Sequence, residues 1–401
     1  MECSSHQFDV IVVGAGIMGS STAYQLAKRG QKTLLLEQFD FLHHRGSSHG
    51  ESRTLRAAYT EDYYCDMVKE SSQIWEQAQS EIGYKVYFKA QQFDMSPSDN
   101  KSLLSIISSC EKKSIPYRVL DRQQVSDRFS GLINLPEDWF GVLTDVGGVI
   151  KPTKAVSMFQ ALAFQRGAVL RDNMEVKNVV KDEVKGGVNV ETADGEKFWG
   201  KKCVITAGAW VRKLVKTVGG LELPIQALET TVCYWRIKEG HEAKFAIGSD
   251  FPTFVSYGEP YVFGTPSLEF PGLIKISVNG GYPCDPDKRP WDPAGISLDS
   301  LKEWIKGRFS GLVDYGGPVA TQSCMYSMTP DEDFVLDFLG GEFGKDVVIG
   351  GGFSGHGFKM APVVGRVLAD LLLSGEAKGV EMKYFRAQRF QDNPKGNVKG
   401  L

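Results

Sequence analysis

Three glycines near the start of the chain have the spacing of a phosphate-binding turn. Gly14, Gly16 and Gly19 form the pattern G-x-G-x-x-G. Its glycines permit a tight turn, a close approach of the backbone to a pyrophosphate, and close packing of a helix on a strand. Glu37 follows at the distance where a carboxylate binds ribose hydroxyls in dinucleotide sites. The residues expected to bind the dinucleotide are Gly14, Ala15, Gly16, Ile17, Met18, Gly19, Glu37 and Gln38.

The elements around this turn are those that a dinucleotide site needs. Residues 8–13 are a β-branched run typical of a buried parallel strand. The following helix keeps three apolar residues on one face before Gly30 ends it, and the segment KTLLLE then supplies a second strand. Such a unit requires a right-handed crossover and a sheet covered on both faces. The N-terminus of its helix favours a bound anion.

Two later segments help to choose the cofactor, because the glycine pattern alone fits both NAD and FAD. Residues 188–202 alternate around Asp194 and Gly195, which is typical of a β-hairpin, and run into the buried segment CVITAGAW. Residues 346–373 again have the pattern of a strand, a glycine cluster and a long helix. An NAD domain needs neither segment, so the sequence favours FAD. A helix starting near Gly357 would place its N-terminus against the pyrimidine end of a flavin, although its glycines also fit an ordinary helix cap.

The fold class that follows is mixed α/β. We expect a Rossmann-like FAD-binding domain that is discontinuous in the sequence, with an inserted substrate domain built on an antiparallel sheet. Nucleotide-type segments lie at the start, middle and end of the 401 residues, a length that exceeds a typical single core. The expected ranges are 1–84, 140–215 and 329–401 for the FAD-binding domain, and 85–139 and 216–328 for the substrate domain.

Composition argues against several other classes of protein. With 42% apolar residues, 24% charged residues and a net charge of −3, the chain has no basic footprint for nucleic acid or an anionic membrane. No apolar run approaches the roughly 20 residues of a membrane span, and the short stretch before the first strand leaves no room for a targeting peptide. The seven cysteines show no C-x-x-C spacing. We therefore expect a reducing compartment and no bound metal.

Five segments connect the chain to a known family. They are FDVIVVGAGIMGSSTAYQLAKRG, GSSHGESRTLRAAY, VITAGAW, SCMYSMTPDEDFVLD and GGFSGHGFKMAP. In this order, and over nearly the whole chain, they resemble the monomeric sarcosine oxidase family, which includes the pipecolate and N-methyl amino acid oxidases. The resemblance implies a monomeric FAD enzyme that oxidises secondary amino acids with O2, giving an imine and hydrogen peroxide.

Cys324 occupies the position at which members of this family attach FAD. The attachment implied by the resemblance is a thioether between the cysteine sulfur and the flavin 8α-methyl group. A free cysteine is otherwise usually a small, inert, buried side chain. Attack by sulfur requires a thiolate, which a neighbouring cation favours. The resemblance supplies Arg53 as that cation, lying against the flavin.

Two further cations match the positions that hold the substrate carboxylate. Arg56 would bind it as a planar fork, and Lys359 in GHGFK matches the second position. Arg53 and Arg56 are three residues apart, which on a helix would place them on neighbouring positions of one face. A solvated basic face is the alternative explanation for this pair.

Lys275 matches the lysine that activates O2, where a fixed positive charge stabilises developing negative charge. Without the resemblance it would be a lysine on the wet face of a strand. Four residues later the bacterial sarcosine oxidases carry a histidine, whereas this chain has Asn279, which does not titrate near neutrality. This departure makes L-pipecolate more plausible without ranking the other secondary amino acids. Tyr326 would pack or hydrogen-bond in the substrate cavity, or belong simply to the core. The candidate catalytic residues are therefore Lys275, Arg53 and Tyr326, with Asn279 at the position of the departure.

Further cofactor contacts are expected in the flavin-side motifs, at Ser47, Ser48, His49, Gly355, His356, Gly357 and Lys359. Two other functions stay open: a flavin dehydrogenase that uses an acceptor other than O2, and a nucleotide-binding module without turnover. We expect an intracellular protein, peroxisomal or cytosolic. The C-terminal VKGL ends in leucine but departs from the peroxisomal S-K-L pattern.

Overall fold

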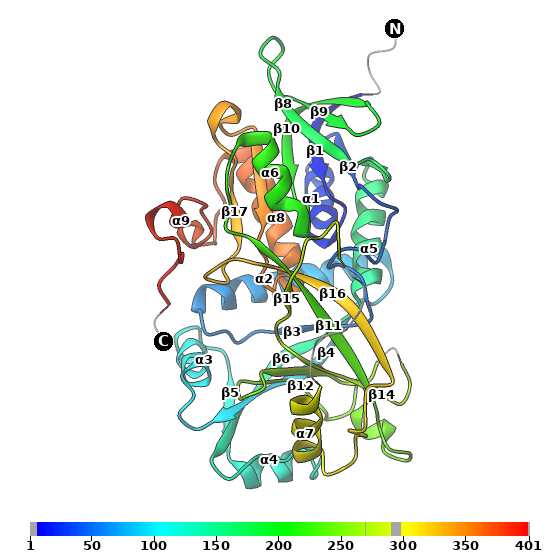
Figure 1. Cartoon of the computed structure of the whole chain (residues 1–401), viewed down its shortest axis with the longest axis vertical. Helices are drawn as coiled ribbons and strands as arrows, with labels where there is room; N and C mark the ends of the chain where they lie inside the picture. Colours follow the sequence, from blue (N-terminus) through cyan, green and yellow to red (C-terminus); the bar gives the residue numbers. More distant parts are fainter. Residues whose placement is uncertain (1–5, 269, 290–297, 400–401) are drawn as a thin grey trace.

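The computed structural model describes residues 6–268, 270–289 and 298–399, and their fold is built on two sheets (Figure 1). The first sheet contains β1 (Gln7–Val13), β2 (Thr33–Leu36), β7 (Val169–Arg171), β8 (Val176–Lys181), β9 (Val188–Thr192), β10 (Lys197–Ile205), β17 (Val335–Phe338) and β18 (Val347–Gly351). Its strand order is β17-β18-β10-β1-β2-β7, with β9 pairing β10 and β8 pairing β9. The predicted hairpin is therefore confirmed as β9 and β10, which pair antiparallel.

Helices cover both faces of the first sheet, which explains why its central strands are apolar throughout. On one face Val10 and Val12 pack in a core shared with α1 (Ile17–Lys28), α5 (Pro152–Gln165) and α8 (Ala361–Ser374). On the other face Ile11 and Val13 pack with α6 (Val211–Gly219) and the β8–β9 hairpin. β1 pairs in parallel with both β2 and β10, so the predicted strand–helix–strand unit lies at the centre of the sheet.

The second sheet forms the lower half of the molecule in Figure 1. It contains β3 (Arg53–Arg56), β4 (Tyr87–Pro97), β5 (Tyr117–Leu120), β6 (Trp139–Ile150), β11 (Gln226–Arg236), β12 (Thr253–Ser256), β13 (Val262–Thr265), β14 (Leu273–Val278), β15 (Tyr282–Pro283) and β16 (Ala320–Met328). The order is β15-β11-β14-β13-β12-β4-β6-β3, with β16 on β11 and β5 on β6. Its neighbours pair antiparallel except for β12 and β4. The mixed α/β fold with an antiparallel second sheet was predicted and is confirmed.

The two sheets do not divide the chain where the sequence analysis placed its boundaries. β3 and almost all of β6 fall in ranges assigned to the FAD-binding domain, yet both strands pair in the second sheet. The long helix α2 (Asp62–Ile82) follows β3 and packs against α5 and α8 under the first sheet. The chain therefore crosses between the two sheets within residues 53–82. None of the helices in the described ranges combines the length and apolar character of a bilayer span.

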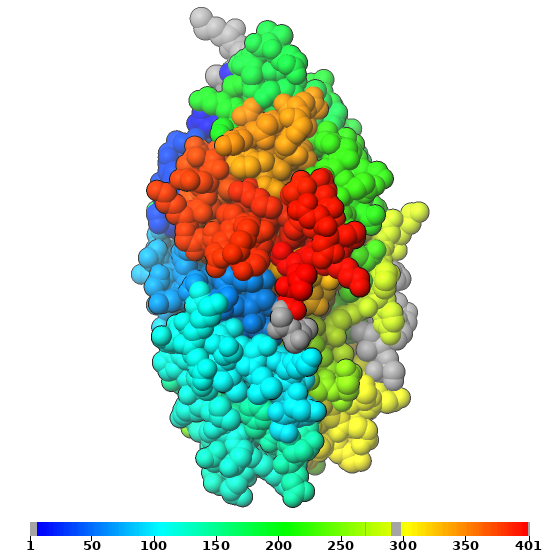
Figure 2. All heavy atoms as spheres, turned by 90° about the vertical axis from the view of Figure 1, so that its left-hand side faces the viewer, coloured from blue at the N-terminus to red at the C-terminus, as the bar shows by residue number. Residues whose placement is uncertain are grey.

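The C-terminal segment is held on the surface against the residues that follow β16. Arg389 forms an ion pair with Asp331 at 2.7 Å, and the two side chains are only 6% and 0% exposed. Asn397 hydrogen-bonds Asp331 and Asp333, and Lys399 lies 3.2 Å from Glu61. Figure 2 shows this red segment lying beside the orange-red region that precedes it. Gly400 and Leu401, the last two residues of the C-terminal VKGL, lie outside the described residues, as does Cys3.

Candidate functional site

The glycine turn at the end of β1 is shaped by close backbone contacts that only glycine permits. A Cβ on Gly14 would lie 2.5 Å from the carbonyl oxygen of Thr206, and the residue has a φ of +95°. A Cβ on Gly19 would lie 1.8 Å from the carbonyl oxygen of Gly14. Gly16 caps α1, which begins at Ile17. The turn therefore brings the backbone to the N-terminus of a helix, as a pyrophosphate site requires.

Glu37 and Ser48 hold the two sides of this turn. The buried Glu37 carboxylate accepts a hydrogen bond from the Ala15 N–H at 2.8 Å and lies 3.3 Å from His43 Nε2. Ser48 Oγ accepts from the Ile17 N–H at 3.0 Å. Residues that the sequence separates by up to 31 positions thus meet at one helix end.

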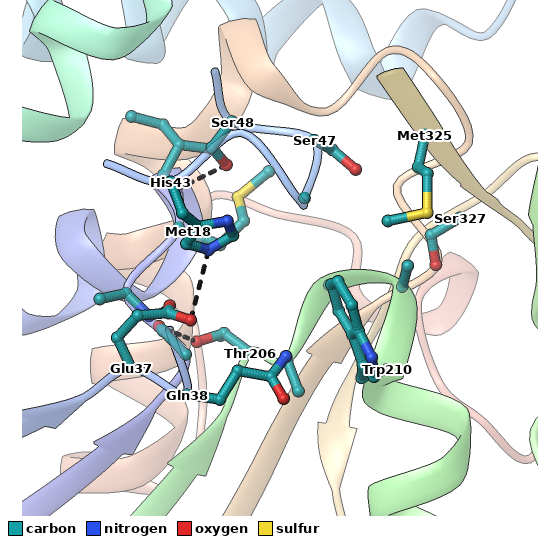
Figure 3. Close-up of a pocket in the computed structure, with 18 of the residues that line it drawn as sticks. Met18, Glu37, Gln38, His43, Ser47, Ser48, Thr206, Trp210, Met325 and Ser327 are labelled. Carbon is teal, nitrogen blue, oxygen red and sulfur yellow. Dashed lines mark hydrogen bonds and ion pairs between the residues drawn. The ribbon is translucent and has the colours of Figure 1, made fainter. Parts of the chain in front are cut away.

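A cavity of about 360 Å³ begins at this turn and reaches the strand that carries Cys324. Figure 3 shows the opening between Glu37 and Gln38 on one side and Met325 and Ser327 on the other. The cavity therefore has lining groups of a dinucleotide site at one end and of the predicted flavin site at the other. The predicted cofactor residues that line it are Gly14, Ala15, Gly16, Ile17, Met18, Glu37, Gln38, Ser47, Ser48, His49, Arg53, Cys324, Gly355 and Gly357, and Tyr326 lines it too.

The lining residues fit a dinucleotide cofactor. The Nε2 atom of His49 is buried and has no hydrogen-bond partner within the described ranges, although this residue lines the cavity. Burial, together with the nearby Arg53, lowers the pKa of His49 to about 3, so its ring is neutral. A neutral imidazole with an unused nitrogen offers a hydrogen bond to a bound polar group. The glycine turn and the unpartnered Nε2 atom of His49 both indicate a bound ligand.

The buried Cys324 and Lys275 form a cluster with the half-buried Arg53, and Cys324 and Arg53 line the cavity away from the glycine turn. Arg53 Nη2 lies 3.5 Å from Cys324 Sγ and also donates to the carbonyl oxygens of Ser47 and His49. Lys275 is 4% exposed and donates to the Ser52 carbonyl oxygen at 2.9 Å, so it does not lie on a wet face. Burial, with Arg53 nearby, lowers the pKa of Lys275 to about 7.

Arg53 and Arg56 do not lie on a helix, which is the case in which their spacing would place them on one face. Both residues belong to the strand β3, which pairs with β6 through Ile150 and Gly147. Side chains alternate along a strand, so residues three apart point to opposite faces. The two arginines therefore meet different partners: Arg53 lies beside Cys324, and Arg56 lies 3.6 Å from Asp94.

Arg56 and Lys359 both contact Tyr59. The Arg56 guanidinium lies over the Tyr59 ring, 4.5 Å from its centroid, and Lys359 Nζ donates to the Tyr59 hydroxyl at 2.9 Å. Arg56 also donates to the Tyr257 hydroxyl. Burial and the neighbouring Arg56 lower the pKa of Lys359, and burial, with Lys359 nearby, lowers that of His356. The two predicted carboxylate-binding cations are thus brought together.

Of the two remaining predicted catalytic residues, Tyr326 reaches the cavity and Asn279 does not. The Tyr326 ring lies against Gly355, 3.0 Å from the point where a Cβ on that glycine would stand, and burial raises its pKa. Asn279 follows β14 and is exposed, and no side-chain hydrogen bond of Asn279 is found in the described part of the chain. The structure therefore brings Tyr326 to the cavity but leaves Asn279 outside the buried cluster. Gly19, His356 and Lys359 are not among the residues that line this cavity.

Sequence reasoning missed three residues that shape the site. Thr206 donates to the Val13 carbonyl oxygen at 3.0 Å and supports the glycine turn. Asp94 and Tyr257 contact Arg56 from a different region of the second sheet. The polar alternation of β4 indicates a strand, but only the sheet register brings Asp94 to Arg56.

Comparisons with known proteins agree with this geometry. The family model for FAD dependent oxidoreductases matches residues 9–371. A probable sarcosine oxidase from Arabidopsis thaliana is 69% identical, with 98% of this chain and 95% of that protein covered. The peroxisomal sarcosine oxidase of Homo sapiens is 36% identical, with 99% and 100% covered.

Among solved structures, the L-proline dehydrogenase of P. horikoshii superposes with a TM-score of 0.82 at 22% identity, covering 96% of this chain and 98% of that one. At this identity the likeness shows the fold alone. The cavity, the glycine turn and the cation cluster thus lie in a chain that matches these two relatives over nearly its whole length. The chain belongs to the FAD-dependent oxidoreductases and, within them, to the sarcosine oxidase family.

Proposed function

We propose that this protein is an FAD-dependent oxidase of secondary amino acids such as sarcosine, L-pipecolate or related N-alkyl and cyclic amino acids. It uses O2 and produces an imine and hydrogen peroxide. One observation carries the proposal: a single cavity joins the glycine turn to the buried cluster around Cys324. FAD, when bound, would supply the redox chemistry, in which the CH–NH group of the substrate loses two electrons and two protons that O2 finally accepts.

The substrate carboxylate is assigned to Arg56 and Lys359. A planar guanidinium binds a carboxylate through two parallel N–H groups, and the lysine adds a second charge. Oxidation of the amine requires the neutral form, whose lone pair is free. Two cations beside the substrate disfavour a protonated amine, so the same groups that hold the carboxylate favour the reactive form. The side chains of Tyr59 and Tyr326 supply apolar walls near these charges.

Lys275 is assigned to the reaction with O2, as a buried positive charge that stabilises negative charge developing on oxygen. Its hydrogen bond to the Ser52 carbonyl fixes its position, and Arg53 lies close enough to lower its pKa. The exposed Asn279 has no role in this proposal. His49 and the glycine-rich segments at residues 14–19 and 355–357 are assigned to FAD.

FAD is proposed to be covalently attached through Cys324. The C–S bond replaces the thiol hydrogen and one hydrogen of the flavin 8α-methyl group, and O2, the oxidant of the proposed reaction, finally accepts the two electrons and two protons released. Arg53, 3.5 Å from Cys324 Sγ, favours the thiolate that this attack requires.

Several broader assignments belong to the same proposal. The FAD-binding domain is assigned to residues 1–84, 140–215 and 329–401 and the substrate domain to 85–139 and 216–328, with β3 and β6 contributed to the second sheet. The protein is proposed to act as a monomer. A peroxisomal location is supported by the name of the human relative and by the peroxide that the reaction yields.

The second candidate is a flavin dehydrogenase that uses an acceptor other than O2, because a proline dehydrogenase has the same fold. Hydrogen peroxide production by the purified protein, with sarcosine and L-pipecolate as substrates and dimethylamine as a control without a carboxylate, tests the choice. Peroxide formed with the amino acids and not with dimethylamine supports the oxidase. Turnover with an artificial dye but without peroxide would favour the dehydrogenase.

A further inference from the structure

A buried carboxylate lies on the same guanidinium that is assigned to the substrate. Asp94 stands in β4, whose side chains alternate between two faces: Phe93 and Met95 enter the apolar core of the second sheet, and Asp94 faces the opposite side. Its side chain is 0% exposed. A buried carboxylate requires partners that offset the loss of water.

Among the described residues, Asp94 has partners on only one of its two oxygens. Oδ1 accepts from Gln92 Nε2 at 3.2 Å and from the Tyr257 hydroxyl at 3.3 Å, and lies 3.6 Å from Arg56 Nη1. Oδ2 is buried without a hydrogen-bond partner among the described residues. An unsatisfied, buried oxygen disfavours the ionised carboxylate relative to the neutral acid.

Arg56 contacts Tyr257 and Asp94 through only one edge of its guanidinium in the described part of the chain. Nη1 donates to the Tyr257 hydroxyl and faces Asp94, whereas no hydrogen bond from Nε or Nη2 is found in the described part of the chain. The free edge is the one that a substrate carboxylate would take. The guanidinium then lies between two carboxylates, one from the protein and one from the substrate.

We propose that Asp94 takes up a proton from solvent when a carboxylate binds to Arg56, so that substrate binding is linked to the protonation of Asp94. This inference rests on the proposed function, in which Arg56 holds the substrate carboxylate. Two anions on one buried guanidinium repel each other, which raises the pKa of the group that can still bind a proton. The unsatisfied Oδ2 makes Asp94 that group.

The other titratable groups facing Asp94 do not compete for this role. They are Tyr257 and Tyr261 from the segment after β12 and Cys110 from α3 (Lys101–Lys112), and burial raises the pKa of each, to about 12 for Cys110. These groups are neutral near pH 7. Burial, opposed by Arg56, raises the pKa of Asp94 itself to about 6. In the free protein Asp94 is therefore ionised above that pH and can take up a proton on binding.

The test compares carboxylate binding by the holoenzyme and by its Asp94→Asn variant. The probe is propionate, which has no amine to titrate, and propionamide is the uncharged control; calorimetry gives the dissociation constant between about pH 5 and pH 8. The proposal is tested by the dissociation constant of the wild type divided by that of Asp94→Asn, measured at each pH. We expect a ratio near one at the acid end that rises about tenfold for each unit by which binding raises the pKa of Asp94. A ratio that does not change with pH would overturn the proposal.

A second measurement separates the contribution of Asp94 from those of Lys275 and Lys359, whose pKa values are also lowered by burial. Proton uptake on propionate binding is counted by calorimetry near pH 7 in buffers of different ionisation enthalpy. The wild type should take up a larger fraction of a proton than Asp94→Asn, and equal uptake would contradict the inference. If Asp94→Asn does not fold, Asp94→Ser takes its place.

The Arg56→Met variant separates this inference from the proposed function. Propionate affinity that is unchanged by Arg56→Met would mean that Arg56 does not hold the carboxylate, and the proposed function would lose its substrate site. Affinity that falls in Arg56→Met, with an Asp94→Asn ratio independent of pH, would remove only the role of Asp94.

Discussion

Arg53 Nη2 lies 3.5 Å from Cys324 Sγ, and both side chains line the cavity that begins at the glycine turn. The proximity of a guanidinium and a thiol explains how one buried cysteine among several would become a nucleophile. Cys203 and Cys233 are equally buried, and burial raises their pKa values to about 12 and about 11. The nearby guanidinium therefore distinguishes Cys324 from these two buried cysteines.

Replacing Cys324 tests the covalent attachment. Acid precipitation of the wild type should leave the yellow colour in the pellet, whereas Cys324→Ala should release all flavin to the supernatant because it lacks the sulfur. The absorbance of pellet and supernatant gives the result. Cys233→Ala is the matched control, since this cysteine lies on the adjacent strand β11 and should leave the pellet yellow. Wild-type flavin in the supernatant would rule out the attachment.

Lys275→Met should slow the oxidative half-reaction selectively. Reoxidation of the reduced enzyme by O2 should fall by about tenfold or more, while reduction by substrate changes little, because Lys275 is assigned to oxygen and not to the substrate. Stopped-flow absorbance separates the two half-reactions. Equal slowing of both would contradict the assignment.

The same lysine predicts a pH dependence of the wild-type reaction with O2. Lys275 is charged below its pKa of about 7 and neutral above it. The rate constant for reoxidation should therefore fall as the pH rises through about 7, and this fall should be absent in Lys275→Met. A wild-type rate constant that stays level or rises over this range would be inconsistent with a role for the charged form.

Arg56→Met should weaken substrate binding. A charge-assisted hydrogen bond contributes about 1.5–3 kcal/mol, so KM should rise roughly tenfold to a hundredfold. Arg56→Lys should restore only part of the affinity, because an ammonium lacks the planar fork. The KM of each variant is measured from the steady-state rate of peroxide formation. An unchanged KM in Arg56→Met would remove Arg56 from the substrate site.

The C-terminal segment should contribute to stability through one buried ion pair. Arg389→Met leaves Asp331 buried without its cation, which should lower the free energy of unfolding by about 3–5 kcal/mol. Lys89→Met breaks an ion pair with Glu76 whose side chains are 72% and 46% exposed, and should cost less than about 1 kcal/mol. Urea denaturation of the two variants gives the comparison. Equal decreases in the free energy of unfolding would mean that the buried ion pair contributes no more to stability than the exposed pair.

Local patterns in the sequence predicted the parts of the site that depend on local geometry. The glycine turn, the first helix and the following strand are fixed by spacing and apolar periodicity over a few dozen residues. The glycine turn and its flanking elements need no knowledge of which strands pair. Lys275 is assigned by resemblance, and its burial against the Ser52 carbonyl depends on contacts with distant parts of the chain.

Features that depend on distant pairing were missed or mistaken. Residues 53–56 form a strand only because β6 supplies partners at residues 147–150, and spacing alone cannot show this. The same pairing places β3 and β6 in the second sheet, although both strands lie almost entirely in ranges assigned to the FAD-binding domain. Asp94 meets Arg56 through the register of β4, β6 and β3, so no local pattern identifies it. Pairing between distant strands cannot be predicted from local patterns in a single sequence.

The flavin spectrum of the purified protein, recorded as L-pipecolate or sarcosine is added without oxygen and again after air is admitted, tests the central claim most directly. The account predicts that the visible absorbance of the oxidised flavin disappears on addition of a secondary amino acid. It should return in air with formation of hydrogen peroxide. A spectrum that no secondary amino acid changes would contradict the proposed function, and bleaching that air does not reverse would leave a dehydrogenase in its place.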